Sequence, residues 1–134
     1  DIAPEAADLA RVLGDARLAM GQRDAVPAGI YAREWLEATG QWEAIAPHLA
    51  ETDNVRSALA LVARAETPLG VVYRTDALAE PQVRILYDIP QETHSPITYP
   101  AAALTDSGAA FMAHLQSDDA RAVFARHGFK PLPE

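Results

Sequence analysis

Several segments of this chain carry apolar residues at the spacing of a helix. The clearest stripe, at positions i, i+3, i+4 and i+7, consists of Val55, Ala58, Leu59 and Val62. Such a stripe indicates a helix that packs one face against a core. The same spacing predicts helices at 27–39, 107–116 and 118–127, a short helix or turn at 42–48, and weak helical character at 5–14. Gly40 and Gly128 are suited to end helices, because glycine readily adopts the left-handed conformation that closes them.

Shorter apolar runs between these helices predict strands. The runs are Arg17–Gly21, Leu69–Tyr73, Val83–Tyr87 and Ile97–Leu104. Strands that are separated by helices indicate an α/β fold.

The composition is that of an ordinary globular domain, with 49% apolar and 22% charged residues. The formal net charge is −8 and no basic block occurs, which argues against binding to nucleic acid or to an anionic membrane surface. The chain has no cysteine for disulfides or thiolate metal ligands. No apolar run approaches the length of a membrane span, and the acidic start at Asp1 lacks signal-peptide character. We therefore expect that a signal peptide was removed or that the chain starts within a longer protein.

One helix start lacks a side chain that could cap it. Pro27 suits the first helical turn, but the preceding position, where Ser, Thr, Asp or Asn is usual, holds Val26. The N–H groups of Ala28 and Gly29 therefore have no obvious internal acceptor, and their small size lets a ligand approach the backbone. An open helix N-terminus of this kind can bind an anion. Close packing of the helix start is the alternative interpretation.

Two further segments fit the anion interpretation. Asn54–Val62 opens a helix, and Thr52, Asp53 and Asn54 compete as its cap. Pro68–Ala77 contains a short apolar strand that ends at Tyr73. With Val26–Ala32, these segments resemble the family of periplasmic molybdate-binding receptors of ABC importers. The likeness also includes Arg17–Gly21, Pro90–Tyr99 and Ala122–Phe129, so that it covers most of the chain.

The resemblance implies one lobe of a type II periplasmic-binding-protein fold, an α/β lobe in which a mixed sheet is flanked by helices. Residues 1–96 are expected to form the second lobe, and residues 97–134 to supply a return strand and C-terminal helices of the first lobe. The rest of the first lobe, with two serine-bearing loops that contact the ligand, is expected to be absent from this chain. The implied function is to bind a tetrahedral oxyanion, molybdate or tungstate, in the periplasm and to deliver it to an ABC permease. Neither catalysis nor a cofactor is implied.

The resemblance also assigns three ligand contacts in this chain: the backbone N–H of Ala28, the backbone N–H of Val55 and the hydroxyl of Tyr73. Two helix N-termini and a phenol supply only neutral donors. These donors suit an anion that is fully deprotonated at neutral pH, whereas the O–H of a protonated phosphate would lack an acceptor. Donors alone do not separate molybdate from the smaller sulfate, so we expect the size of the cavity to do so.

Other interpretations of the same residues stay open. Val55 also belongs to the apolar stripe of its helix, and Tyr73 has the position of a packing tyrosine at a strand end. Asp53 would compete for the anion's donors if it were the cap. Arg74 is expected to be solvated or ion-paired. The segment 22–24, Gln-Arg-Asp, departs from the more acidic loop of the resembled family, which leaves the start of the first helix undecided.

Two other functions are less favoured. An oxyanion-sensing regulatory domain of a larger protein could be built on the same lobe. A hydrolase-type α/β enzyme would need Tyr73, Asp76 and His94 to act together, but the chain has no nucleophile motif such as Gly-x-Ser-x-Gly. The four histidines lack metal-binding spacing, so we expect no metal site.

The closing helices carry large apolar residues that would pack on the first lobe in the resembled family. These are Phe111, Leu115, Val123, Phe124 and Phe129. Exposed apolar side chains of this size promote association. We therefore expect the chain to self-associate, and the alternative is that residues 104–134 fold back over their own lobe.

Overall fold

The computed structural model describes residues 9–130, which divide into two compact units, one that ends at Pro96 and one that starts at Ile97. This boundary is the one at which we expected the second lobe to end, although the assignment of the units to lobes stays a prediction. Within residues 9–130 no helix is both long enough and apolar enough to cross a bilayer.

A three-stranded parallel sheet lies at the centre of the first unit. The central strand, β1 (Leu18–Gly21), pairs with β2 (Leu49–Thr52) on one side and with β3 (Leu69–Gly70) on the other. All four residues of β1 are buried, because a central strand has a neighbour at each edge and helices on both faces.

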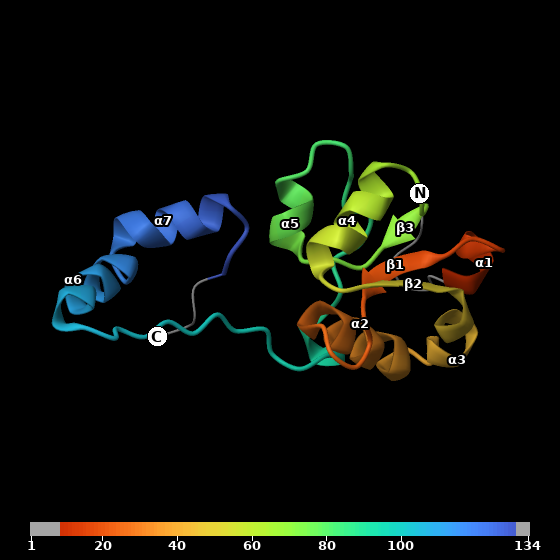
Figure 1. Ribbon diagram of the computed structural model, residues 1–134, viewed down its shortest axis with the longest axis horizontal. Helices are drawn as coiled ribbons and strands as arrows, with labels where there is room; N and C mark the ends of the chain where they lie inside the picture. The colour runs from red at the N-terminus through yellow and green to blue at the C-terminus, as the bar shows by residue number, and fades with distance from the viewer. Residues whose placement is uncertain (1–8, 131–134) are drawn as a thin grey trace. The chain divides into compact units, whose positions relative to one another are not determined.

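Helices cover both faces of this sheet (Figure 1). α2 (Pro27–Ala38) and α3 (Trp42–Ile45) lie on one face, and α4 (Val55–Ala63) and α5 (Arg74–Leu78) lie on the other. The α/β class predicted from the sequence is therefore confirmed.

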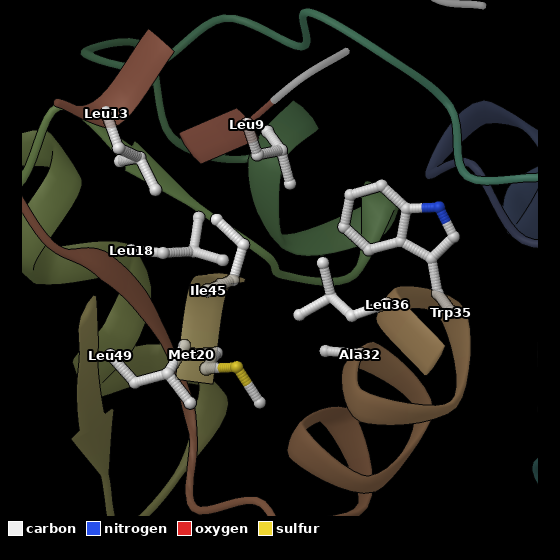
Figure 2. Close-up of a cluster of buried hydrophobic side chains, with 9 residues drawn as sticks. All are labelled: Leu9, Leu13, Leu18, Met20, Ala32, Trp35, Leu36, Ile45 and Leu49. Carbon is white, nitrogen blue, oxygen red and sulfur yellow. The ribbon is translucent and has the colours of Figure 1, made fainter. Parts of the chain in front are cut away.

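The main core lies between the sheet and the face covered by α2. Side chains alternate along a strand, so Leu18 and Met20 of β1 point to the same face and meet Leu36 of α2 and Ile45 of α3 (Figure 2). The remaining buried members of this cluster are Leu9 and Leu13 of α1 (Leu9–Leu13), Ala32, Trp35 and Leu49. Each large apolar side chain buried here stabilises the fold by about 1.5–3 kcal/mol.

The helices predicted in the first unit are confirmed, with boundaries close to those expected. The segment 42–48 forms α3 and then the 3-10 turn η2 (Ala46–His48). Gly40 has a φ of +70° directly after α2, as expected of a glycine that ends a helix. Of the weak helix at 5–14, α1 is seen, while residues 5–8 lie outside the described part.

The strand predictions are less accurate. Leu69–Tyr73 forms only the two residues of β3, and within the described chain neither Val83–Tyr87 nor Ile97–Leu104 is a strand. Residues 83–89 alternate between half-buried and exposed positions, as an extended chain does. Each of these segments lacks a neighbouring strand in the described chain with which to share a hydrogen-bond ladder. The described sheet is therefore entirely parallel, and the expectation of a mixed sheet is wrong for this part of the chain.

The second unit consists of two helices and an aromatic contact. α6 (Asp106–Leu115) and α7 (Asp118–Arg126) lie within one residue of the predicted boundaries. Gly128, with a φ of +88°, closes α7 as expected, and Phe129 then packs edge-on against neighbouring aromatic rings. Phe111 is 61% exposed on α6, so the second unit covers little of this side chain.

Candidate functional site

Three helices of the first unit begin at the carboxyl edge of the sheet. β1 leads to α2, β2 to α4 and β3 to α5. β1 and β2 are neighbours, yet the helices that follow them lie on opposite faces of the sheet (Figure 1). In α/β folds a crevice opens at such a point, outside the carboxyl ends of the strands, and ligands bind there.

A cavity of about 290 Å³ lies at this edge of the first unit. It is lined by residues 25–28, by residues 53–55 and by Tyr73. The fold therefore brings Ala28, Val55 and Tyr73, which come from three separate segments, to the wall of one cavity. Their contact with a ligand stays a prediction.

At the start of α2, the N-cap residue Val26 has an extended backbone and makes no side-chain cap hydrogen bond. Its carbonyl oxygen accepts from the N–H of Gly29 at 2.8 Å and from the N–H of Ile30 at 3.0 Å. Gly29 therefore has an internal acceptor, and the expectation that its N–H is open is wrong. The N–H of Ala28 has no acceptor within residues 9–130, because it lies too early in the helix for an intrahelical bond.

The small size of Gly29 is explained by packing rather than by access for a ligand. A Cβ atom at this position would collide with the carbonyl oxygen of Gly21 and would lie 2.5 Å from that of Gln22. The first turn of α2 thus sits directly on the end of β1, and this contact sets the place of the Ala28 N–H.

Of the three candidate cap residues at the start of α4, Asn54 is the one that caps the helix. Its side-chain oxygen accepts from the N–H of Ser57 at 2.9 Å, and Thr52 supports it by donating from Oγ1 to the Asn54 carbonyl oxygen at 2.8 Å. Asp53 does not take this role. The N–H of Val55, the first residue of the helix, has no acceptor in the described part of the chain.

Tyr73 does not end a strand, as the sequence suggested, but is the N-cap residue of α5 with an extended backbone. It is half-buried and lines the cavity. Its neighbour Arg74 is ion-paired, as expected, with an Nη1 to Oδ1 distance of 2.6 Å to Asp88.

The ion pair of Arg23 and Glu51, called the clamp below, joins the loop that follows β1 to strand β2. Arg23 donates to Glu51 from its backbone N–H and from Nε, both at 2.9 Å to Oε1, and from Nη2 at 2.8 Å to Oε2. The guanidinium also lies 5.1 Å from the centre of the Trp42 ring, a distance suited to a cation–π contact. Hydrogen bonding from Arg23 holds the pKa of the Glu51 carboxyl below its ordinary value and raises the pKa of Arg23.

Sequence reasoning missed this clamp. The segment 22–24 stood out only as a departure from the resembled family. Arg23 and Glu51 are 28 positions apart, a separation at which charge patterns along the chain carry no information on pairing.

The three residues of the enzyme alternative differ in their surroundings. Tyr73 lines the cavity, whereas Asp76 pairs with Arg56. His94 lies with its ring centre 5.9 Å from that of Tyr31 and its Nδ1 2.8 Å from the Ser95 carbonyl oxygen. In residues 9–130 no group of three His, Asp or Glu side chains is placed to hold a metal ion.

Comparison with known proteins gives concordant results. The family model described as bacterial extracellular solute-binding protein matches residues 2–130. The molybdate-binding protein ModA of Escherichia coli (strain K12) is 41% identical over 122 residues, which are 88% of this chain and 48% of that protein. The putative ABC transporter substrate-binding lipoprotein YvgL of Bacillus subtilis is 36% identical over 118 residues, 84% of this chain and 45% of that protein. The chain thus spans about half the length of the curated relatives it matches.

Solved structures agree. The substrate binding domain of a putative molybdenum ABC transporter from Clostridium difficile superposes with a TM-score of 0.75 at 29% identity, over 87% of this chain and 53% of that one. The periplasmic molybdate-binding protein of Azotobacter vinelandii has a TM-score of 0.78 over 99% of this chain and 61% of that one, and its 18% identity supports the fold alone. The resemblance identified from the sequence is confirmed.

Proposed function

Because the chain belongs to the family of bacterial extracellular solute-binding proteins, we propose that it forms one lobe of a receptor that binds molybdate or tungstate for an ABC importer. The observation that carries this proposal is that Ala28, Val55 and Tyr73 line the same cavity. Two of these residues have backbone N–H groups without an acceptor in the described chain, and the third has a phenol.

The chemistry of these donors favours a dianion of tetrahedral shape. Two helix starts direct N–H groups and partial positive charge into the cavity, and they require no counter-charge from lysine or arginine. A molybdate ion presents four oxygen acceptors and no proton. A protonated phosphate would bring an O–H group, and leaving such a group unpaired costs about 1–3 kcal/mol.

We assign residues 1–96 to the second lobe of the receptor and residues 97–134 to a segment and helices that complete the first lobe. The remaining donors would then come from the half of the relatives that this chain does not match. The complete receptor closes over the anion in the periplasm and delivers it to a permease, with binding and no catalysis as its task. The description of the family as extracellular solute-binding proteins and the names of the Escherichia coli and Bacillus subtilis relatives support this location and role.

Titration of the ¹⁵N-labelled chain with sodium molybdate, followed by amide chemical shifts, tests the proposal. We expect saturable shifts at the amides of Ala28 and Val55 at millimolar molybdate, because a lobe with half of the donors leaves the anion in water. Tungstate should act alike, and phosphate at the same ionic strength should shift these amides less.

Capped helix starts in the same chain provide an internal control. The N–H of Gly108 donates to Thr105 Oγ1 and that of Ala120 donates to Ser117 Oγ, both at 3.3 Å. These amides should not move during the titration. Equal shifts at capped and open starts, or no saturable shift at Ala28 and Val55, would refute the proposed site.

A further inference from the structure

An ion pair beside the cavity joins the first turns of α4 and α5. Arg56 follows Val55, and its Nε lies 2.8 Å from Oδ1 of Asp76. Asp76 lies in the first turn of α5, where its N–H donates to the carbonyl oxygen of Tyr73 at 3.1 Å. The pair therefore links the two segments that carry Val55 and Tyr73, although neither Arg56 nor Asp76 lines the cavity itself.

The two partners differ sharply in exposure. The side chain of Asp76 is 9% exposed, whereas that of Arg56 is 74% exposed. Among the described residues Asp76 is the one charged residue that is buried. A buried carboxylate is costly unless a cation or several hydrogen bonds compensate it. Arg56, on the solvent side, supplies the positive charge that compensates the carboxylate of Asp76.

The charge of Asp76 is the wrong one for the proposed site. The residues that line the described cavity include no Lys, Arg or His, whereas Asp53 is one of them. A second uncompensated carboxylate, one helical turn from Tyr73, would repel a dianion, and the low dielectric of a buried position strengthens that repulsion.

We propose that Arg56 is a positioning residue of the anion site that acts by cancelling the charge of Asp76. This inference rests on the proposed function and extends it from the donors to a residue outside the cavity. An ion pair can have two roles here, and they can be told apart. A mechanical link needs both partners, whereas charge cancellation needs Arg56 only as long as position 76 carries a carboxylate.

The test uses the amide-shift titration of the whole chain with sodium molybdate. Arg56→Gln should weaken molybdate binding about tenfold, because it exposes the site to an unpaired charge. Arg56→Lys keeps the positive charge, and the double variant Arg56→Gln/Asp76→Asn removes both charges, so each should bind within about twofold of the parent. Arg64→Gln is the matched control, since Arg64 forms an exposed ion pair with Glu66 at the other end of α4 and should leave binding unchanged.

Each other outcome has a distinct meaning. If the double variant binds as weakly as Arg56→Gln, the pair is only a mechanical link and the inference is wrong. The inference also fails if Arg56→Gln binds like Arg64→Gln. If the parent chain shows no saturable shift at Ala28 and Val55, the proposed function fails first and this inference falls with it. The amide spectrum of each variant reports directly that the variant is folded.

Discussion

Replacement of Gly29 by alanine tests whether the start of α2 is held against β1 by backbone contact. The added methyl group would collide with the carbonyl oxygen of Gly21 and approach that of Gln22 to 2.5 Å. Both obstacles are backbone atoms, so no side-chain rotation can relieve the contact. The helix must instead move away from the strand, and the N–H of Ala28 moves with it.

The magnitude follows from two opposing terms. Overpacking typically costs about 1–3 kcal/mol, and a backbone collision lies at the upper end of this range. Alanine regains about 0.5–1 kcal/mol of helix stability relative to glycine. We therefore expect Gly29→Ala to lower the free energy of unfolding of the first unit by about 2 kcal/mol.

Urea denaturation followed by tryptophan fluorescence measures this loss, because Trp35 is buried in the core of the first unit. Gly108→Ala is the matched control, since Gly108 is also the third residue of its helix and a Cβ there would lie 3.4 Å from Ala103 Cβ, an ordinary contact. The control should leave the fluorescence transition unchanged. The packing argument is refuted if Gly29→Ala unfolds at the same urea concentration as Gly108→Ala.

Three further predictions concern the site and the second unit. Tyr73→Phe should weaken molybdate binding by about 0.5–3 kcal/mol in the amide-shift titration with little change in folding; unchanged binding would remove Tyr73 from the site. Because Arg23 lowers the pKa of Glu51, Glu51 stabilises the fold above its unfolded pKa of about 4.3, and this stability is lost as the pH falls through the lower folded pKa. Urea titrations between about pH 6 and about pH 3, a range that spans these pKa values, should therefore show a smaller acid-induced loss of stability in Glu51→Gln than in the parent. Finally, light scattering at micromolar concentration should show self-association, since Phe111 is 61% exposed; a clean monomer would contradict this.

The sequence by itself determined the elements that depend on local interactions. The apolar stripe that starts at Val55 specifies α4, and Gly40 and Gly128 end helices because a left-handed residue there satisfies the last carbonyl groups. The absence of a side-chain cap at Val26 could also be predicted, since an N-cap interaction involves only residues a few positions apart. These same local motifs carried the family resemblance and with it the three candidate ligand contacts.

Strand pairing was decided by the tertiary structure. β2 was missed because Leu49 is its only buried residue, as suits a strand at the edge of the sheet. Val83–Tyr87 has the alternation of a strand and still forms none, because a strand exists only where a neighbour shares its hydrogen bonds.

The charges around the cavity were likewise settled by the fold. Arg23 pairs with Glu51, and Arg56 pairs with the buried Asp76, and in each pair the two residues come from different segments of the chain. The fold also explains why position 29 holds a glycine: the backbone of Gly21 leaves no room for a Cβ atom there, and no ligand is needed to account for it. Local sequence sets which donors a helix start offers. The convergence of these donors on one cavity depends instead on contacts between segments far apart in the chain, and only the packed structure brings those segments together.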